Sequence, residues 1–341
     1  MRAPTSPPSH PGIVASRILA TGHYAPERIL TNSDLEKMVD TSDAWIVERT
    51  GIRERHIAAE GQASSDMAAE AARRALEAAD VRADELDLII VATVTPDMPL
   101  PATAVFVQQK IGARSDCPAF DIAAACAGFI YGMSIADRFI AGGAKRVLIV
   151  GVELLSRVMN WKDRTTCVLF GDGAGAAVIG PRSESDGARG ILSTHLYADG
   201  SQANALCIPG GGSKTPATQL SVEAGLHYVH MAGQDVFKYA VRALSSASLT
   251  AIEHNGVTKD EIRWVVPHQA NLRIIEAVSK RVGIPLDRFV LNIARYGNTS
   301  SASIPIALDE AVRAGTIQKG DLVLMCALGA GFAYGSALVR F

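Results

Sequence analysis

Hydrophobic residues along the chain follow two alternating patterns. Short, uninterrupted apolar runs at 88–94, 147–152 and 264–266 are typical of strands buried on both faces of a sheet. Between such runs, apolar residues recur every three or four positions, most clearly at 65–79, which predicts an amphipathic helix. The Ser-Ser-Asp sequence at 64–66 offers N-caps for that helix. This alternation predicts an α/β fold.

One apolar segment, 322–339, is long enough to resemble a membrane span and contains no charged residue. Its glycines at 329, 331 and 335 argue against a helix, because each weakens a helix by about 1 kcal/mol relative to alanine. We therefore expect two buried strands joined by a glycine-containing turn, and no insertion into a membrane.

The sequence also resembles itself at a separation of roughly 170 to 176 residues, which is too long for a solenoid repeat and indicates a duplicated domain. The corresponding segments are 84–86 and 260–262 before a strand, 110–112 and 281–283 at a helix end, expected strands at 119–122 and 289–293, and 141–142 and 314–315, where the halves realign. Two such halves would pack across a pseudo-twofold axis, with ligands at the strand ends where the halves meet.

The duplication sets the expected domain boundaries. Residues 1–13 are proline-rich without an apolar core, which predicts a disordered lead and not a signal peptide. Residues 14–182 form the first half and 232–341 the second. The glycine- and serine-rich segment 183–231 is expected to be an insertion of loops and a hairpin that links them.

Composition narrows the class of function. The 341 residues are 48% hydrophobic, enough for a sizeable core, and the net charge of -2 lacks the basic footprint that nucleic-acid binding requires. Five cysteines without a C-x-x-C pair favour a reducing cytoplasm over a disulfide framework or a zinc site. His227 and His230 lack a third ligand, so no metal is assigned. The glycines at 171–175 lack the lysine of a phosphate loop, which favours a tight hairpin.

Three residues stand where chemistry is expected. Cys126 follows the expected strand 119–122 where the chain turns into a helix, whose N-terminus would lower the pKa of the thiol. His268 ends a strand of the second half, and Asn298 holds the place in that half that Cys126 holds in the first. If the halves pack pseudo-symmetrically, the three side chains converge. The alternative is a small buried cysteine and two unrelated polar turn residues.

These residues also carry a resemblance to a known family. The sequences D-I-A-A-A-C-A-G-F, V-P-H-Q-A-N-L-R and R-Y-G-N-T-S-S-A-S resemble the three signatures of the β-ketoacyl-acyl-carrier-protein synthase III family, the initiating condensing enzymes of type II fatty-acid synthesis. Segments 40–55, 170–177 and the C-terminal G-S-A-L-V-R-F match as well, so the resemblance spans about 14–341. It implies a thiolase-like fold of two duplicated α/β halves packed in layers, and a cytoplasmic homodimer.

The resemblance implies a decarboxylative Claisen condensation of a short acyl-CoA, such as acetyl-CoA, with malonyl-acyl-carrier protein, and acyl-CoA is then a substrate and no cofactor is needed. Cys126 would hold the acyl group as a thioester. His268 and Asn298 would donate hydrogen bonds to the malonyl thioester oxygen, and the backbone N–H groups of Cys126 and Ala330 would form a second oxyanion hole. The family usually has glycine where this chain has Ala330, and the donor survives if φ is negative there.

The resemblance also implies substrate and partner contacts. The residues expected to bind coenzyme A are Trp45, Arg49, Arg164, Gly233, Phe237 and Asn271. The residues expected to bind the acidic carrier protein are Gln269, Ala270, Asn271, Leu272 and Arg273. In a homodimer, Leu100 of the proline-rich loop 95–101 would cap the acyl pocket of the partner subunit.

Three other functions remain open at this point. A thiolase-fold enzyme of secondary metabolism would use another acceptor in place of malonyl-acyl-carrier protein. A Cys-His-Asn hydrolase would leave the expected adenine and phosphate contacts without a purpose. A non-catalytic scaffold would show no enhanced reactivity of Cys126 toward iodoacetamide.

Overall fold

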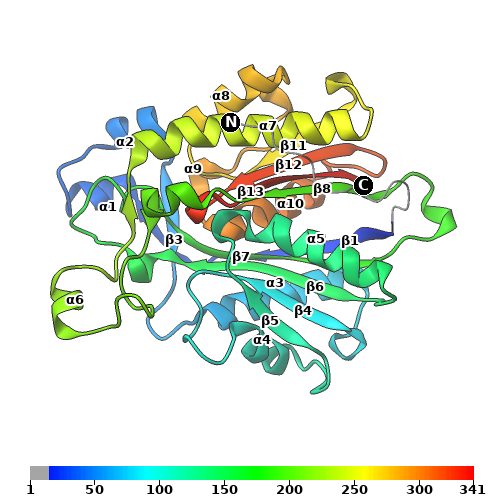
Figure 1. Ribbon diagram of the computed structural model, residues 1–341, viewed down its shortest axis with the longest axis horizontal. Coiled ribbons are helices and arrows are strands. Elements are labelled where there is room, and N and C mark those ends of the chain that lie inside the picture. The colour runs from blue at the N-terminus through cyan, green and yellow to red at the C-terminus, as the bar shows by residue number, and fades with distance from the viewer. Residues whose placement is uncertain (1–14) are drawn as a thin grey trace.

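The computed structural model describes residues 15–341 as two mixed sheets separated and covered by helices (Figure 1). The first sheet has the strand order β1-β7-β6-β4-β5. Its strands are β1 (Ser16–Tyr24), β7 (Asp172–Pro181), β6 (Val147–Leu154), β4 (Leu88–Ala92) and β5 (Ala119–Ile122). Strand β4 pairs in parallel with β5 and β6, whereas β7 is antiparallel to β6 and β1. Strands β4 and β6 are buried along their whole length, as their apolar runs predict.

The second sheet repeats this order as β8-β13-β12-β11. Its strands are β8 (Gly190–Tyr197), β13 (Tyr334–Arg340), β12 (Leu322–Leu328) and β11 (Trp264–Pro267). The β11–β12 pair is parallel and the other two pairs are antiparallel. Strands β12 and β13 confirm the hairpin expected at 322–339, and no helix in the described residues is long and apolar enough to cross a membrane.

The strand expected at 289–293 is wrong. Only Phe289 forms a bridge, parallel to Val265, at the place that β5 takes beside β4 in the first sheet. The N–H groups of Asn292 and Ile293 donate to the side-chain oxygen of Gln269 at 3.1 and 3.2 Å. These backbone groups are therefore not available for a strand ladder, and Ile293 begins helix α9 (Ile293–Tyr296).

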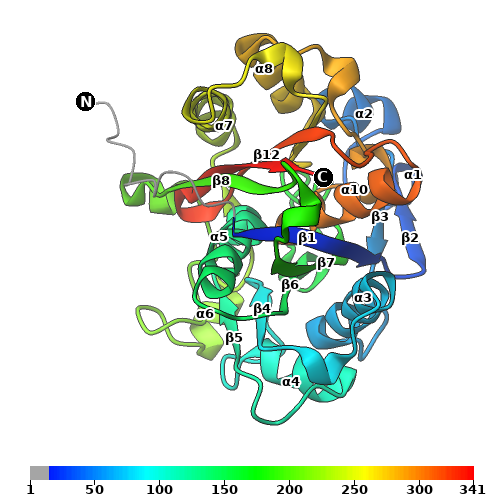
Figure 2. The same ribbon diagram turned by 90° about the vertical axis from the view of Figure 1, so that its right-hand side faces the viewer.

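Helices complete a five-layer stack (Figure 2). Helices α5 (Gly128–Ala141) and α10 (Ser303–Arg313) lie between the two sheets, and their apolar residues belong to one core with strands of both. Helices α3 (Ser64–Ala79) and α4 (Thr103–Ile111) cover the outer face of the first sheet. Helices α7 (Gly233–His254) and α8 (Leu272–Val282) cover the outer face of the second. The cores on both faces of each sheet explain its continuous apolar strands.

The shorter elements lie at the edge of these layers. They are β2 (Arg28–Thr31), α1 (Asn32–Glu36), α2 (Asp43–Thr50), β3 (Glu54–Ile57), β9 (Leu206–Cys207), α6 (Gln219–Glu223) and β10 (His230–Met231). Strands β2 and β3 form one antiparallel pair, and β9 and β10 form another. Helix α6 lies apart from the layers (Figure 1).

The start of α3 differs from the prediction. Ala63 is the N-cap residue, and it has no side-chain cap of its own. Instead, the carboxylate of Asp97, in the proline-rich loop, accepts hydrogen bonds from the backbone N–H and the hydroxyl of Ser65 at 2.8 and 2.5 Å. An acceptor from a distant loop therefore satisfies the first turn, and it ties that loop to the helix.

The glycines at 171–175 do not form the expected hairpin, because Gly173 and Gly175 lie within strand β7. A Cβ atom on Gly175 would lie 2.7 Å from the Cβ of Pro305, and one on Gly173 would lie 2.9 Å from the Cδ1 of Ile306. Both contacts are with helix α10. The glycines therefore allow the central helix to approach the sheet closely.

The segment 183–231 is not only an insertion, since β8 lies within it and pairs with β13 in the second sheet. Its remaining residues hold β9, α6 and β10 in long connections. The expected disordered lead at 1–13 lies outside the described residues. The boundaries of the two halves therefore stay a prediction, although the repeated strand order is consistent with a duplication.

Candidate active site

Cys126 lies at the turn between strand β5 and helix α5, as expected. A 3₁₀ turn at Ala125–Ala127 joins the two elements, and Ala125 has a left-handed φ of 45°. The Cys126 side chain is 7% exposed. Close packing forces this geometry, because a Cβ on Gly329 would clash with the backbone nitrogen of Cys126. The thiol is therefore fixed by its surroundings where the first half meets the second.

The pKa of the Cys126 thiol differs from the expectation that a helix N-terminus would lower it. Burial raises this pKa to about 12, the nearby Glu153 carboxylate acts in the same direction, and a hydrogen bond with the Ser300 hydroxyl opposes them. Loss of hydration thus outweighs the favourable backbone field at the start of α5.

His268 follows strand β11 and is held as a neutral imidazole. Its backbone N–H donates to the carbonyl of Cys326 at 2.8 Å, and its ring Nδ1 lies 2.6 Å from the Ser303 hydroxyl at the start of α10. Burial lowers the pKa of His268 to about 3. At neutral pH the ring can therefore donate one hydrogen bond and accept another, and it carries no charge.

Asn298 lies just before α10, in the loop that follows α9. Its backbone N–H donates to Leu169 at 2.9 Å, and its side-chain oxygen accepts from the backbone N–H of Ser300 at 2.8 Å. Gly297 precedes it with φ 63°, and a Cβ there would lie 2.8 Å from the carbonyl oxygen of Leu169. The hydrogen bond to its side-chain oxygen fixes the orientation of the amide, so the NH₂ group is left to donate to a ligand.

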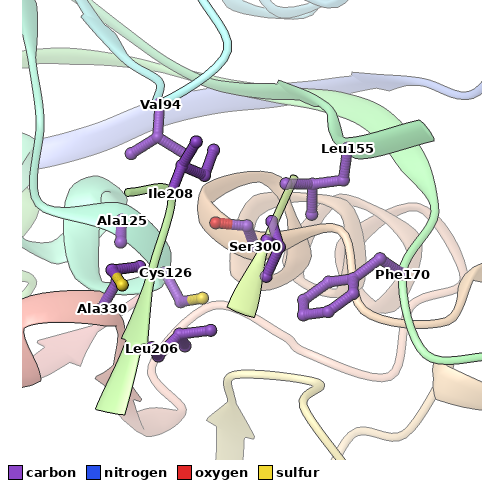
Figure 3. Close-up of a pocket in the computed structure, with 11 residues that line it drawn as sticks. Val94, Ala125, Cys126, Leu155, Phe170, Leu206, Ile208, Ser300 and Ala330 are labelled. Atoms are coloured by element: carbon purple, nitrogen blue, oxygen red, sulfur yellow. The ribbon is translucent and has the colours of Figure 1, made fainter. Parts of the chain in front are cut away.

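Two cavities meet at Cys126. The smaller one, of about 100 Å³, is lined by Cys126, His268 and Asn298 together with Gly233, Phe237 and Asn271. The larger one, of about 260 Å³, has an almost wholly apolar lining (Figure 3). Its lining residues are Val94, Ala125, Cys126, Leu155, Phe170, Leu206, Cys207, Ile208, Val229, Ser300 and Ala330. The structure thus brings the three candidate catalytic residues onto one cavity and gives Cys126 a second, hydrophobic cavity.

Ala330 meets the condition set for a backbone donor. It lies in the turn between β12 and β13, and it is not among the non-glycine residues with positive φ, whereas the following Gly331 and Phe332 have φ of 68° and 44°. Ala330 and Cys126 line the same apolar cavity. The assignment of their backbone N–H groups to a second oxyanion hole therefore stays a prediction.

The expected coenzyme A contacts form a cluster. The guanidinium groups of Arg49 and Arg164 lie 4.6 and 5.5 Å from the centroid of the Trp45 ring. The side chain of Asn271 donates to the backbone carbonyl of Arg49 at 3.0 Å, and Asn271 also lines the smaller cavity. The cluster is therefore joined to a residue that lines this cavity, and an aromatic face with two cations is a combination that suits a nucleotide ring and its phosphates.

The segment expected to bind a carrier protein is only partly accessible. Gln269 is 1% exposed, and its side chain donates to the carbonyls of Pro267 and Val290 at 2.9 and 3.1 Å. The inclusion of Gln269 is therefore wrong, because its side chain holds neighbouring backbone and cannot reach a partner protein. Ala270, Asn271 and Leu272 are partly buried, and Arg273 is exposed.

Leu100 is 84% exposed, the most exposed large apolar residue in the described part of the chain. It lies in the proline-rich loop, which Asp97 anchors to α3. An apolar side chain held out in water by an anchored loop is consistent with an interface.

The sequence did not single out Glu153, Ser300 or Ser303, which lie around the candidate residues. Ser303 contacts His268, and Ser300 contacts both Asn298 and Glu153. A signal for Glu153 was present, since it is the only charged residue in the apolar strand β6. A carboxylate in a wholly buried strand is rarely retained without a polar partner or a function.

Comparisons with known proteins identify the family to which this chain is similar. Residues 120–200 match the family described as 3-oxoacyl-[acyl-carrier-protein (ACP)] synthase III, and residues 252–341 match its C-terminal region. The β-ketoacyl-[acyl-carrier-protein] synthase III of Caldanaerobacter subterraneus is 54% identical over 329 residues, which are 96% of this chain and 98% of that protein.

Solved structures show the same fold. A crystal structure of 3-oxoacyl-[acyl-carrier-protein] synthase III from Aquifex aeolicus is 47% identical with a TM-score of 0.87, covering 96% of this chain and 100% of that chain. The priming β-ketosynthase of the R1128 polyketide pathway is 36% identical with a TM-score of 0.87, covering 100% and 98%. The expected thiolase-like fold is confirmed, and the homodimer stays a prediction. The chain belongs to the β-ketoacyl-acyl-carrier-protein synthase III family of acyltransferases.

Proposed function

We propose that this chain carries out the condensation that initiates fatty-acid synthesis through an acyl group held on Cys126. The observation that supports this most directly is the position of Cys126 between a polar cavity with His268 and Asn298 and a separate apolar cavity. A short acyl-CoA and malonyl-acyl-carrier protein react in two steps, and the products are 3-ketoacyl-acyl-carrier protein, coenzyme A and carbon dioxide.

In the first step, the thiolate of Cys126 attacks the acyl carbon and displaces coenzyme A. The backbone N–H groups of Cys126 and Ala330 stabilise the oxyanion, and the acyl chain enters the apolar cavity. An apolar cavity of about 150 Å³ holds a benzene molecule, which has six carbons. The cavity of about 260 Å³ therefore accommodates acetyl groups and primers several carbons longer.

In the second step, His268 and Asn298 donate hydrogen bonds to the thioester oxygen of the malonyl group while carbon dioxide leaves. The Ser303 hydroxyl accepts from the backbone N–H of Gln269 at 3.3 Å and can donate its own hydrogen to Nδ1 of His268. The ring hydrogen is then on Nε2, as a donor to the enolate oxygen requires. The carbanion attacks the acyl group on Cys126, and the thiolate is released.

The remaining assignments concern binding. Trp45 stacks on the adenine of coenzyme A, and Arg49 and Arg164 pair with its phosphates. The pantetheine arm passes Gly233, Phe237 and Asn271 to reach Cys126. Exposed Arg273, with the accessible parts of 270–272, binds the acidic carrier protein. Two chains form a homodimer in which Leu100 of each closes the apolar cavity of the other.

A second candidate function is the priming of a specialised pathway. The priming β-ketosynthase of the R1128 polyketide pathway shares this fold over the whole chain at 36% identity, so the fold supports both uses. The acceptor and primer separate them. Preference for an acetyl primer with the carrier protein of fatty-acid synthesis would support the first function.

The proposed function is tested with labelled acetyl-CoA and purified protein. Label should become covalently attached at Cys126 and should transfer to malonyl-acyl-carrier protein as a 3-ketoacyl product. Cys126→Ala should abolish both, whereas Cys207→Ala, which alters the other cysteine of the apolar cavity, should abolish neither. Label that persists in Cys126→Ala would refute the assignment of the nucleophile.

A further inference from the structure

Arg55 is a buried cation that the condensation described above does not use. It lies in strand β3 and is fully buried, and its hydrogen bonds all go to uncharged oxygen atoms. Burial lowers the pKa of Arg55 to about 10, so the guanidinium is still charged at neutral pH. An apolar side chain of similar size would fill the same space without the loss of hydration that a buried charge suffers. The charge is therefore not explained by packing alone.

The guanidinium of Arg55 joins two parts of the chain that are distant in sequence. Its Nη1 donates to the carbonyl of Leu30 at 3.1 Å and to the side-chain oxygen of Asn32 at 2.9 Å. Its Nη2 donates to the carbonyl of Val168 at 2.8 Å. Asn32 is also buried, and its own amide donates to the carbonyl of Ile52 at 2.8 Å. One side of the guanidinium is therefore anchored between β2 and α1, and the other side holds the segment that precedes β7.

The segment that Arg55 holds is the one to which the backbone of Asn298 is bound. The N–H of Asn298 donates to the carbonyl of Leu169 at 2.9 Å, and the carbonyl of Asn298 accepts from the N–H of Gly171 at 3.0 Å. Together these hydrogen bonds form a parallel bridge between Phe170 and Asn298. The carbonyl that receives the guanidinium belongs to the residue just before Leu169, so the two attachments lie on consecutive residues.

The loop of Asn298 also packs directly on the Arg55 side chain. A Cβ on Gly171 would lie 2.9 Å from the Cβ of Arg55, and one on Gly297 would lie 3.4 Å from it. Strand β3 lies beside helix α9, which leads into this loop (Figure 1). The N–H of Arg53 in front of this strand donates to the carbonyl of Ala294 in α9 at 3.0 Å. Arg55 therefore contacts both segments that hold the backbone of Asn298.

We propose that Arg55 is a positioning residue that keeps the amide of Asn298 directed at the malonyl thioester. This amide is oriented by its backbone and by one hydrogen bond from Ser300, so a shift of the segment 168–171 would move its NH₂ group. That NH₂ group acts in decarboxylation and not in the acylation of Cys126. The inference rests on the proposed function of Asn298 and adds the group that holds this residue in place. A displacement of about 1 Å at a reacting group can cost about 100-fold in rate.

The test measures the two half-reactions separately in the full-length protein. Acylation of Cys126 is followed in a single turnover with saturating labelled acetyl-CoA. The second step is followed in acylated enzyme by the release of carbon dioxide from malonyl-acyl-carrier protein that is labelled at its free carboxyl group. Arg55→Met keeps a long unbranched side chain but removes all hydrogen bonds of the guanidinium. It should slow the release of carbon dioxide by about 100-fold and leave acylation within about twofold of the wild type.

A double-mutant cycle separates positioning of Asn298 from a general loss of structure. Asn298→Ala alone should slow the release of carbon dioxide, and adding Arg55→Met should slow it at most about threefold further, because the amide that Arg55 positions is then absent. Losses that multiply would contradict the proposal. An unchanged rate in Asn298→Ala would overturn the proposed function of Asn298 and this inference with it. A slow Asn298→Ala beside an unaffected Arg55→Met would overturn this inference alone.

The matched control is Ile57→Ala in the same strand. Ile57 is buried in one apolar core with Leu30 and Val168, so this variant loses packing there but keeps every hydrogen bond of Arg55. In the folded variant, the ratio of the two half-reaction rates should equal that of the wild type. A change in this ratio as large as that in Arg55→Met would show a structural effect and refute the proposal.

Arg55→Lys decides the matter if Arg55→Met does not fold. An ammonium group keeps the charge but lacks the planar, two-pronged geometry that reaches acceptors on both sides. Release of carbon dioxide should therefore slow by about tenfold while acylation is kept, a smaller loss than in Arg55→Met. Equal slowing of both half-reactions, or no slowing of either, would refute the positioning role.

Discussion

Replacing His268 by glutamine should make the stability of the protein less sensitive to acid. His268 is 3% exposed, and burial lowers its pKa to about 3. In the unfolded chain the same side chain has a pKa near 6.5, so below that pH the unfolded state binds a proton that the folded state does not. The free energy of unfolding is therefore not reduced by His268 above pH 6.5, and it falls as the pH is lowered from 6.5 toward 3.

The size of the effect follows from the two pKa values. At pH 5 the unfolded histidine is almost fully protonated, and the difference between 6.5 and about 3 lowers the free energy of unfolding by about 2 kcal/mol. At pH 3 the loss reaches about 4 kcal/mol. These losses are large compared with the 5 to 15 kcal/mol that typically stabilise a folded protein.

The measurement is urea unfolding of wild type and His268→Gln at pH 7.5 and pH 5. Between pH 7.5 and pH 5, the unfolding free energy of the wild type should fall by about 2 kcal/mol more than that of His268→Gln. The other titratable groups are the same in both proteins, so their contributions cancel in this comparison. His230→Gln, the same substitution at an exposed histidine, is the matched control. Equal acid sensitivity of wild type and His268→Gln would refute the claim that His268 is buried as a neutral ring.

Three further predictions concern the two half-reactions, the interface and the core. Asn298→Ala should keep single-turnover acylation of Cys126 by labelled acetyl-CoA but raise the barrier to decarboxylation by about 3 kcal/mol. An equal loss of rate in both steps would indicate a structural role. Leu100→Phe should lower kcat/KM for longer primers relative to acetyl-CoA by a factor corresponding to about 1 to 3 kcal/mol, and an unchanged ratio would contradict a cap from the partner subunit. Gly175→Ala should cost about 1 to 3 kcal/mol in urea unfolding, because the new Cβ would lie 2.7 Å from Pro305, and full stability would contradict the tight packing of α10 on β7.

The elements of the fold that depend on neighbouring residues could be predicted from the sequence. The buried strands, helix α3, the hairpin at 322–339 and the turn at Cys126 all follow from apolar runs, helical spacing and glycines. The strand expected at 289–293 failed because the side chain of Gln269, distant in sequence, takes its backbone donors. The hairpin expected at 171–175 is wrong because Gly173 and Gly175 lie within a strand and allow α10 to approach it, a contact that no local pattern reveals.

Within the site, residue types and positions were more predictable than electrostatics. The strand–helix turn indicated Cys126, and the duplication indicated His268 and Asn298. The direction of the Cys126 pKa was wrong because burial is a property of the whole fold and outweighs one helix terminus. Gln269 was expected to bind the carrier protein through the family resemblance alone, and only the packed structure shows that it faces inward.

The burial of α5 and α10 between the two sheets has a consequence for motion. Amide hydrogens in a helix covered on both sides exchange with solvent only when much of the protein opens, so these two helices should belong to its slowest-exchanging amides. Cys126 lies in the turn just before α5, and Asn298 lies in the loop before α10. We therefore expect the main chain at the nucleophile and at the hydrogen-bond donor to stay in place when substrates of different length bind. Any adjustment of the apolar cavity to these substrates is then expected in the surface segment around β9, which lines the cavity through Leu206, Cys207 and Ile208.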